Sequence, residues 1–190
     1  DPWKDPLGVI DAYRLVKEEV AGVQLALVGS MAHDDPEGWE YWHQTVAYAD
    51  GDPDIFILSN LNNVGSVEVN AFQVHSAAVI QKSIKEGFGL TVSEGLWKAR
   101  PTVAGNVGGI VTQIEDGRTG LLFRDPTEFQ TKLLRLATMP ELARDLGDAA
   151  RDYVAQHRML GYQVAPRIAW YRSLWARRES LTAALEERLA

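Results

Sequence analysis

Residues 77–97, AAVIQKSIKEGFGLTVSEGLW, contain an apolar run, a glycine-rich loop and an amphipathic segment in succession. The run at 77–81 is short and apolar, as strands buried on both faces of a parallel sheet are. Gly87 and Gly89 allow the loop backbone to come close to a ligand. Thr91 is expected to cap the following helix, whose first-turn N–H groups would favour a phosphate. The stretch therefore predicts a strand, a ligand-binding loop and a helix.

The sequence on both sides of this stretch repeats the same alternation. Three more short apolar runs predict buried strands at residues 23–29, 54–58 and 101–104. An Asp followed by Pro marks the expected start of three helices, since Asp is a good N-cap and Pro suits the first helical position; these caps are Asp5, Asp35 and Asp125. Strands alternating with helices predict an α/β fold with a doubly wound, mostly parallel, Rossmann-like sheet.

The tail of the chain has a different composition. Residues 161–190 carry more large apolar side chains than the terminal helix of one domain needs to bury, namely Ile168, Tyr171, Leu174, Trp175 and Leu181. Exposed apolar patches of this kind mark interfaces. We expect residues 1–160 to form one domain and residues 161–190 to form a helix that docks on another domain or on a second subunit, with a homodimer as one option.

Composition excludes several classes of function. The net charge of -7 argues against a nucleic-acid partner, which usually requires a basic excess. The chain has no Cys, which excludes disulfide and thiolate chemistry, and its 4 His lack metal-ligand spacing, so no metal site is expected. No apolar run approaches the roughly 18 residues that span a bilayer, so no membrane partner is expected. With no visible signal peptide, a cytoplasmic protein is expected.

Two carboxylates, Glu86 and Glu94, stand on either side of the glycine-rich turn. A carboxylate accepts strong hydrogen bonds from adjacent sugar hydroxyls, so this pair could hold two sugars, one on each side of a diphosphate. Each element also has a simpler explanation. Residues 91–94 match a capping box, which would make Glu94 a helix-cap residue, and the glycines alone would make a turn.

Two neighbouring features have simple explanations by themselves. Lys82 could reach a phosphate, but a solvated lysine is the expected state. The stretch Gly108–Ile110 is expected to form a tight turn.

The run EGFGLTVSE, residues 86–94, resembles the Glu-x7-Glu motif of retaining glycosyltransferases of the GT-B architecture. The stretches WKDP at 3–6 and VAGNVGGI at 103–110 are similar to the same family, and QKS at 81–83 with LWK at 96–98 points to its trehalose glycosyltransferring synthases. The resemblance extends from Trp3 to about Tyr171, but only as the C-terminal, donor-binding half of the family's protein. It implies a Rossmann-like domain that binds a nucleotide sugar.

The resemblance implies two catalytic positions. Glu86 matches the family's first Glu, which contacts hydroxyls of the transferred sugar. Lys4 matches the Lys that neutralises the diphosphate. Gly87, Phe88 and Gly89 match the backbone turn beside the same sugar.

It also implies the residues that hold the nucleotide. Leu90 and Thr91 match the positions whose N–H groups meet the diphosphate. Glu94 matches the second Glu, which holds the ribose hydroxyls. Gln81 lies where the family's backbone meets the base.

The activity implied is transfer of glucose from a nucleoside diphosphate glucose to free glucose, forming trehalose with the anomeric configuration kept. No cofactor or metal is required, and Mg²⁺ is compatible with this scheme but not implied by the sequence. The family's acceptor site lies in an N-terminal domain not in this chain, and the Arg that it pairs with the Lys is also absent, so the chain alone is expected to be inactive.

Three alternatives remain open at this stage. The chain could be an isolated nucleotide-sugar-binding module without turnover. It could instead belong to a GT-B relative that transfers sucrose or mannose units, or to a sugar-nucleotide epimerase. A receiver-like domain is disfavoured, because the ends of the first two expected strands, Gly29-Ser30 and Ser59-Asn60, supply no acidic cluster.

Overall fold

The computed structural model describes residues 2–189; the side chains of residues 163, 180–186, 188 and 189, including that of Leu181, lie outside the description. The chain divides into two units, Asp1–Arg151 and Asp152–Ala190. The first unit contains every strand described below, and the second contains the end of helix α6 and all of α7.

The strands of the first unit are parallel, as predicted, and form two ladders. One ladder joins β1 to β2, and the other has the order β3-β4-β5. The central strand β4 is buried along its whole length, as expected for a strand between two parallel neighbours. The strands are β1 (Leu25–Val28), β2 (Ile55–Leu58), β3 (Val79–Gln81), β4 (Thr102–Gly105) and β5 (Leu121–Phe123). Strand β5 was not predicted.

All three Asp-Pro helix starts are confirmed. The side chains of Asp5, Asp35 and Asp125 accept the N–H of the third helical residue at 3.1, 2.9 and 2.9 Å. The α-helices are α1 (Pro6–Glu19), α2 (Pro36–Ala49), α3 (Ser66–His75), α4 (Leu90–Trp97), α5 (Pro126–Thr138), α6 (Pro140–His157) and α7 (Leu160–Leu189). Short 3₁₀ helices are η1 (Pro2–Lys4), η2 (Asn60–Asn62) and η3 (Gly108–Thr112).

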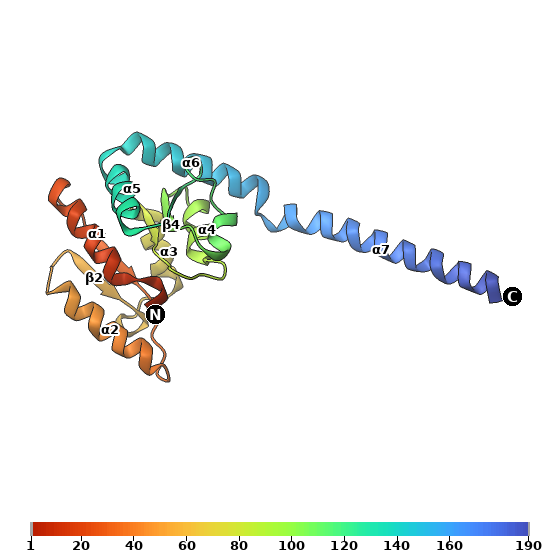
Figure 1. Ribbon diagram of the computed structural model, residues 1–190, viewed down its shortest axis with the longest axis horizontal. Coiled ribbons are helices and arrows are strands. Elements are labelled where there is room, and N and C mark those ends of the chain that lie inside the picture. The colour runs from red at the N-terminus through yellow and green to blue at the C-terminus, as the bar shows by residue number, and fades with distance from the viewer. Residues whose placement is uncertain (1, 190) are drawn as a thin grey trace. The chain divides into compact units, whose positions relative to one another are not determined.

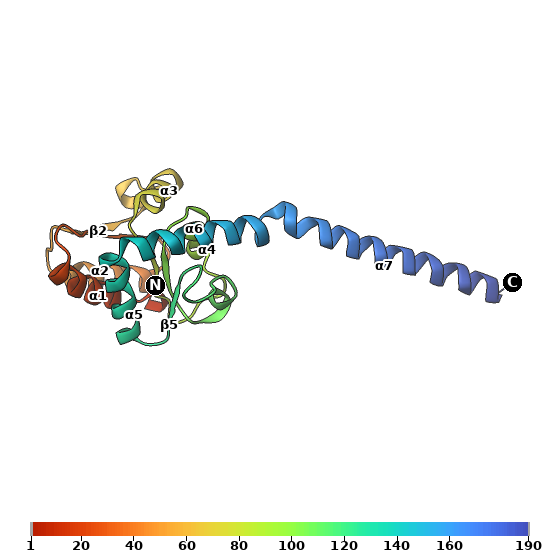
Figure 2. The same ribbon diagram turned by 90° about the horizontal axis from the view of Figure 1, so that it is seen from above.

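The core of the first unit lies between helices and the strands that they cover. Helix α1 runs beside α5 (Figure 1), and Ile10 and Phe129 of these helices are fully buried. Helix α3 lies on the opposite side of β2 from α1 and α2 (Figure 2). Helices on both sides of parallel strands confirm the predicted doubly wound α/β class.

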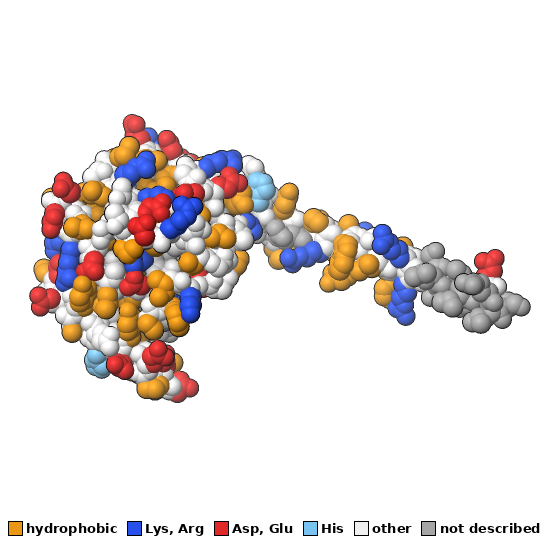
Figure 3. Space-filling model, viewed as in Figure 1, with side chains coloured by type: hydrophobic (Ala, Val, Ile, Leu, Met, Phe, Trp, Pro, Cys, Tyr) orange, Lys and Arg blue, Asp and Glu red, His pale blue; other side chains and the backbone are white. Residues whose placement is uncertain are grey.

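The second unit presents apolar side chains to the solvent. Large exposed residues recur along the described part of α7, interspersed with basic ones (Figure 3). They are Leu160, Tyr162, Ile168, Trp170, Tyr171, Leu174 and Trp175. Among the described residues, no helix has both the length and the apolar character needed to cross a membrane.

Candidate functional site

Helix α4 begins two residues earlier than the sequence predicts. Its N-cap is Gly89, in the left-handed region with φ 83°, and this residue provides no side-chain cap. The predicted N-cap, Thr91, lies inside the first turn, so that prediction was wrong. The reason is conformational: a left-handed glycine turns the chain into the helix before Thr91 is reached. The first turn therefore presents backbone N–H groups without a capping side chain, an arrangement that favours an anion.

Glu86, in the loop between β3 and α4, accepts hydrogen bonds from three side chains. Its Oε2 accepts hydrogen bonds from the Lys4 ammonium, from Gln81 Nε2 at 3.1 Å and from Ser83 Oγ at 3.2 Å. Burial raises the pKa of Glu86, but the Lys4 ammonium, with help from the Ser83 hydroxyl and the Gly87 N–H, lowers it below its ordinary value. The carboxylate is therefore held ionised and in one orientation.

Glu94 has a separate set of partners. It is exposed in the second turn of α4, where its Oε2 accepts a hydrogen bond from Gln73 Nε2 of α3 at 2.6 Å. Gln73 is buried, and its Oε1 accepts from the Lys98 ammonium at 2.7 Å. Because the helix begins at Leu90, Glu94 cannot close a capping box, so that alternative was wrong. Gln73 therefore orients the Glu94 carboxylate, which is otherwise open to solvent.

The expected turn at Gly108 is part of the site. The Gly109 N–H donates to the Gly87 carbonyl at 3.1 Å, so the two glycine-rich segments are joined through their backbones. A Cβ on Gly108 would lie 1.7 Å from the Glu86 carbonyl oxygen, and one on Gly109 would lie 2.3 Å from the Gly87 carbonyl oxygen. Glycine is therefore required at both positions for this approach.

A residue that the sequence did not indicate supports the turn from inside. Gln113 is buried, and its amide donates to the Phe88 carbonyl while its oxygen accepts from the Ser93 hydroxyl. Phe88 and Leu90 themselves are 48% and 68% exposed, so the outer surface of the turn is open. No local pattern marks Gln113 or Gln73, since their roles depend on partners that are distant in sequence.

Lys82 is not the solvated lysine that the sequence predicted. Its side chain is 6% exposed and pairs with the Asp5 carboxylate. The ammonium also stands 5.6 Å from the centroid of the Phe129 ring. The prediction failed because the counter-charge lies 77 positions away in sequence, and a buried lysine requires such a partner.

The structure brings together Glu86, predicted for the sugar, with Lys4, predicted for the diphosphate, and leaves Glu94, predicted for the ribose, apart from them. Lys4 reaches Glu86 from η1, and Gln81, expected near the base, directs its side chain to the same carboxylate. Glu94 contacts a different group of residues. Among the side chains that the structure describes, no cluster of three or more His, Asp or Glu could hold a metal ion.

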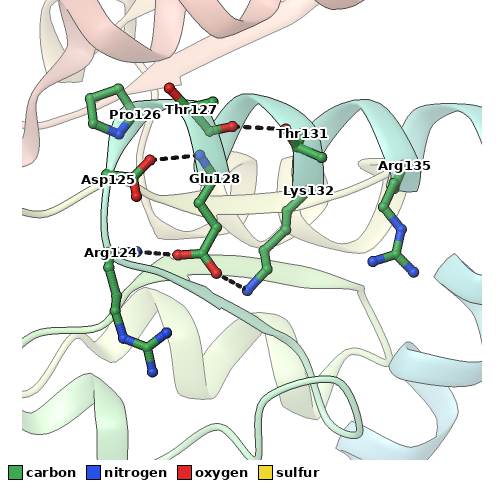
Figure 4. A pocket seen from close by; sticks show the side chains of 8 residues that line it. All are labelled: Arg124, Asp125, Pro126, Thr127, Glu128, Thr131, Lys132 and Arg135. Carbon is green, nitrogen blue, oxygen red and sulfur yellow. Dashed lines mark hydrogen bonds and ion pairs between the residues drawn. The ribbon is translucent and has the colours of Figure 1, made fainter.

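An open pocket of about 840 Å³ lies elsewhere, at the start of α5 (Figure 4). Its polar groups serve the helix: Glu128 accepts the Arg124 N–H at 2.8 Å and the Lys132 ammonium at 2.8 Å, while its own N–H donates to Asp125. These hydrogen bonds and the Glu128–Lys132 ion pair are explained by the start of α5, so this pocket is not assigned to the candidate site.

Known proteins provide the comparison for this geometry. A trehalose synthase from Rubrobacter xylanophilus is 63% identical over 154 residues, which cover 81% of this chain and 37% of that protein. A sucrose-phosphate synthase structure from Thermosynechococcus elongatus has a TM-score of 0.76 at 22% identity and covers 93% of this chain and 44% of that one. The Anabaena protein HepE, solved with UDP-glucose, has a TM-score of 0.69 at 22% identity over 91% of this chain and 46% of that one.

These likenesses agree with one another. The two solved structures show that the fold is that of the Rossmann-like domains of GT-B glycosyltransferases. The matched part spans only 37% of the length of the trehalose synthase. The family model for glycosyl transferases group 1 matches residues 1–153. The chain therefore belongs to the glycosyl transferases group 1 family.

Proposed function

We propose that this chain is the donor-binding domain of a retaining glycosyltransferase that moves glucose from a nucleoside diphosphate glucose to free glucose and forms trehalose. The observation that carries the proposal is the joint placement of Lys4 and Glu86 beside the glycine turn before α4. Support for the product comes from the trehalose synthase that is 63% identical to this chain. Support for the donor class comes from HepE, which was solved with UDP-glucose.

The proposed donor binds with its diphosphate at the start of α4. The N–H groups of Leu90 and Thr91 and the Lys4 ammonium face this group, and the helix start favours negative charge there. Glu86 accepts hydrogen bonds from the glucose hydroxyls, and Glu94 accepts them from the ribose. The Glu86 side chain is 13% exposed and Glu94 is exposed, so both carboxylates can still accept hydrogen bonds from a ligand.

The proposed reaction places developing charge on the departing phosphate. That phosphate takes the proton of the acceptor hydroxyl, so no protein nucleophile is needed. The protein contributes by stabilising the phosphate through Lys4 and the first-turn N–H groups of α4. Preorganised donors of this kind contribute about 2.7–4 kcal/mol each to transition-state stabilisation.

The acceptor sugar is proposed to bind an N-terminal domain outside this chain. The match to the trehalose synthase relative spans 37% of the length of that relative. The 190-residue chain would then bind the donor without turnover. We also propose that the segment 161–190 docks on that domain or on a second copy of the chain, through the exposed aromatic residues of α7.

Calorimetry tests the proposal directly. The chain is titrated with ADP-, UDP- and GDP-glucose and with the three free nucleotides. We expect one base to be preferred and the sugar to add affinity. Failure to bind any of the six ligands would contradict the proposal. Addition of an N-terminal domain, followed by identification of the product, then distinguishes trehalose formation from transfer to another acceptor, from epimerisation and from binding alone.

A further inference from the structure

Trp3, the residue before Lys4, is fixed to the loop that contains Glu86. The Ile84 N–H donates to the Trp3 carbonyl at 2.9 Å. The Lys85 ammonium stands 4.2 Å from the centroid of the Trp3 ring, within cation–π range. The backbone immediately before Lys4 therefore follows the loop.

Asp5, the residue after Lys4, is held by an ion pair with Lys82. The Lys82 ammonium contacts Asp5 Oδ2, while Oδ1 accepts the Gly8 N–H at 3.1 Å and caps α1. A Cβ on Gly8 would lie 2.5 Å from Lys82 Nζ, so the absence of a side chain there makes room for the ammonium. Asp5 itself is in the left-handed region with φ 45°, which is unfavourable for a residue with a Cβ.

Stability alone is a weak explanation for this pair. A buried ion pair often contributes no more than an apolar replacement of the same volume, because both charges lose their hydration. The pair does hold one geometry: Lys82 binds Oδ2 of Asp5 while the Gly8 N–H binds Oδ1, and together these contacts keep the strained backbone directly after Lys4 in place. Lys82 is 6% exposed and Asp5 is 28% exposed, so solvent provides little freedom to change it.

We infer that Lys82 is a positioning residue for the nucleotide site, which acts through Asp5 to hold Lys4 where its ammonium meets both Glu86 and the diphosphate of the donor. This inference rests on the proposed function. It adds that the strength of phosphate binding depends on a lysine that does not touch the phosphate.

A double-mutant cycle tests the inference. ADP, UDP and GDP are titrated by calorimetry into the unaltered 190-residue chain, Lys82→Met, Lys4→Ala and the double variant. We expect Lys82→Met to weaken binding about tenfold, the loss that one charge-assisted hydrogen bond carries. The double variant should bind within about twofold of Lys4→Ala, since both changes remove the same contact. Lys82→Met should also make the affinity less sensitive to salt, as Lys4→Ala does.

The matched control is Lys132→Met. Lys132 is also a shielded, ion-paired lysine, 14% exposed, but it lies on α5 and pairs with Glu128 and Asp116. We expect it to lower the melting temperature without changing nucleotide affinity or its salt dependence. If Lys82→Met does not fold, Asp5→Asn makes the same test, because Asn keeps a capping oxygen for α1.

The outcomes separate the two proposals. If the unaltered chain binds no nucleotide, the proposed function fails and the inference falls with it. If that chain binds but the Lys82 change weakens binding equally with and without Lys4, or has no effect, only the positioning role is overturned. Asp5→Asn replaces Lys82→Met in this comparison should the latter unfold.

Discussion

The Lys4 ammonium and the Glu86 carboxylate form an ion pair between residues 82 positions apart in sequence. Lys4 is 46% exposed and Glu86 is 13% exposed, so the pair lies at the edge of the site. The proposed function assigns the two groups to different parts of one ligand, the diphosphate and the sugar. A phosphate at Lys4 would compete with Glu86 for the same ammonium, and a sugar hydroxyl at Glu86 would offset that loss.

Glu86→Gln should therefore separate the two ligands. We expect affinity for the nucleotide-glucose to fall, because an acceptor of sugar hydroxyls loses its charge, with a loss of about 1.5–3 kcal/mol. Affinity for the bare nucleoside diphosphate should stay unchanged or rise, because Lys4 is released. Calorimetry with both ligands measures this, and Glu115→Gln, which removes an exposed carboxylate paired with Arg118, is the control. Equal losses for the two ligands would exclude a role at the sugar.

Under the proposed function, the lowered pKa of Glu86 predicts the pH range of donor binding. Its contribution to stability is fully present above the ordinary glutamate pKa of about 4.3 and is lost as the pH falls through the lower folded-state value. We expect affinity for the nucleotide-glucose to be flat from about pH 8 to about pH 5 and to decline only in stronger acid. The decline should be absent in Glu86→Gln, with circular dichroism confirming the fold. A decline centred above pH 5 would be inconsistent with this carboxylate.

Glu94→Ala should weaken nucleotide binding and leave the fold intact. The carboxylate is exposed and lies outside the core, and its removal leaves one donor, Gln73 Nε2, without this acceptor. We expect a loss of about 1.5–3 kcal/mol of nucleotide affinity and only a small change in melting temperature. Gln73→Leu should weaken the same affinity less, because it removes only the orientation of Glu94. A lower melting temperature with unchanged affinity would indicate a structural role for Glu94 instead.

Gly108→Ala should damage the site, whereas Gly22→Ala should not. Both glycines have positive φ, 49° and 74°, so each alanine carries left-handed strain of about 1–2 kcal/mol. Only Gly108 has the Glu86 carbonyl at 1.7 Å from the new Cβ, while Gly22 has nothing within 4 Å. Urea unfolding should show the greater loss of stability for Gly108→Ala, and calorimetry should show weakened donor binding for that variant alone. Equal behaviour of the two would refute the close approach of the two turns.

Deletion of residues 174–190 should reduce association without unfolding the first unit. The deleted part of α7 carries the exposed Leu174 and Trp175, which have the character of an interface. Analytical ultracentrifugation with and without an N-terminal domain measures pairing and self-association. Loss of the cooperative thermal transition on deletion would instead place the segment in the core.

The sequence predicted the features that are local. Asp5, Asp35 and Asp125 cap helices because one side chain and a following proline determine each start. The parallel strands followed from short apolar runs. The start of α4 was misplaced because the sequence does not state the dihedral angles of Gly89.

The features that the sequence did not predict depend on partners that are distant along the chain. The burial of Lys82 follows from Asp5, and the role of Gln113 follows from carbonyl groups on another loop. No window of neighbouring residues contains either relationship. Similarly, the division of the strands into two ladders depends on which strands pair with one another, which periodicity does not specify.

The two ion pairs between the start of the chain and the loop after β3 have a consequence for folding. They join residues 77 and 82 positions apart, so closing these contacts must pay the loop entropy of everything between them. That intervening segment includes β1, α2, β2 and α3. In a refolding experiment, the capacity to bind nucleotide should therefore recover after helical circular dichroism has returned. Nucleotide affinity would then serve as a kinetic reporter of the final docking of the chain's first residues.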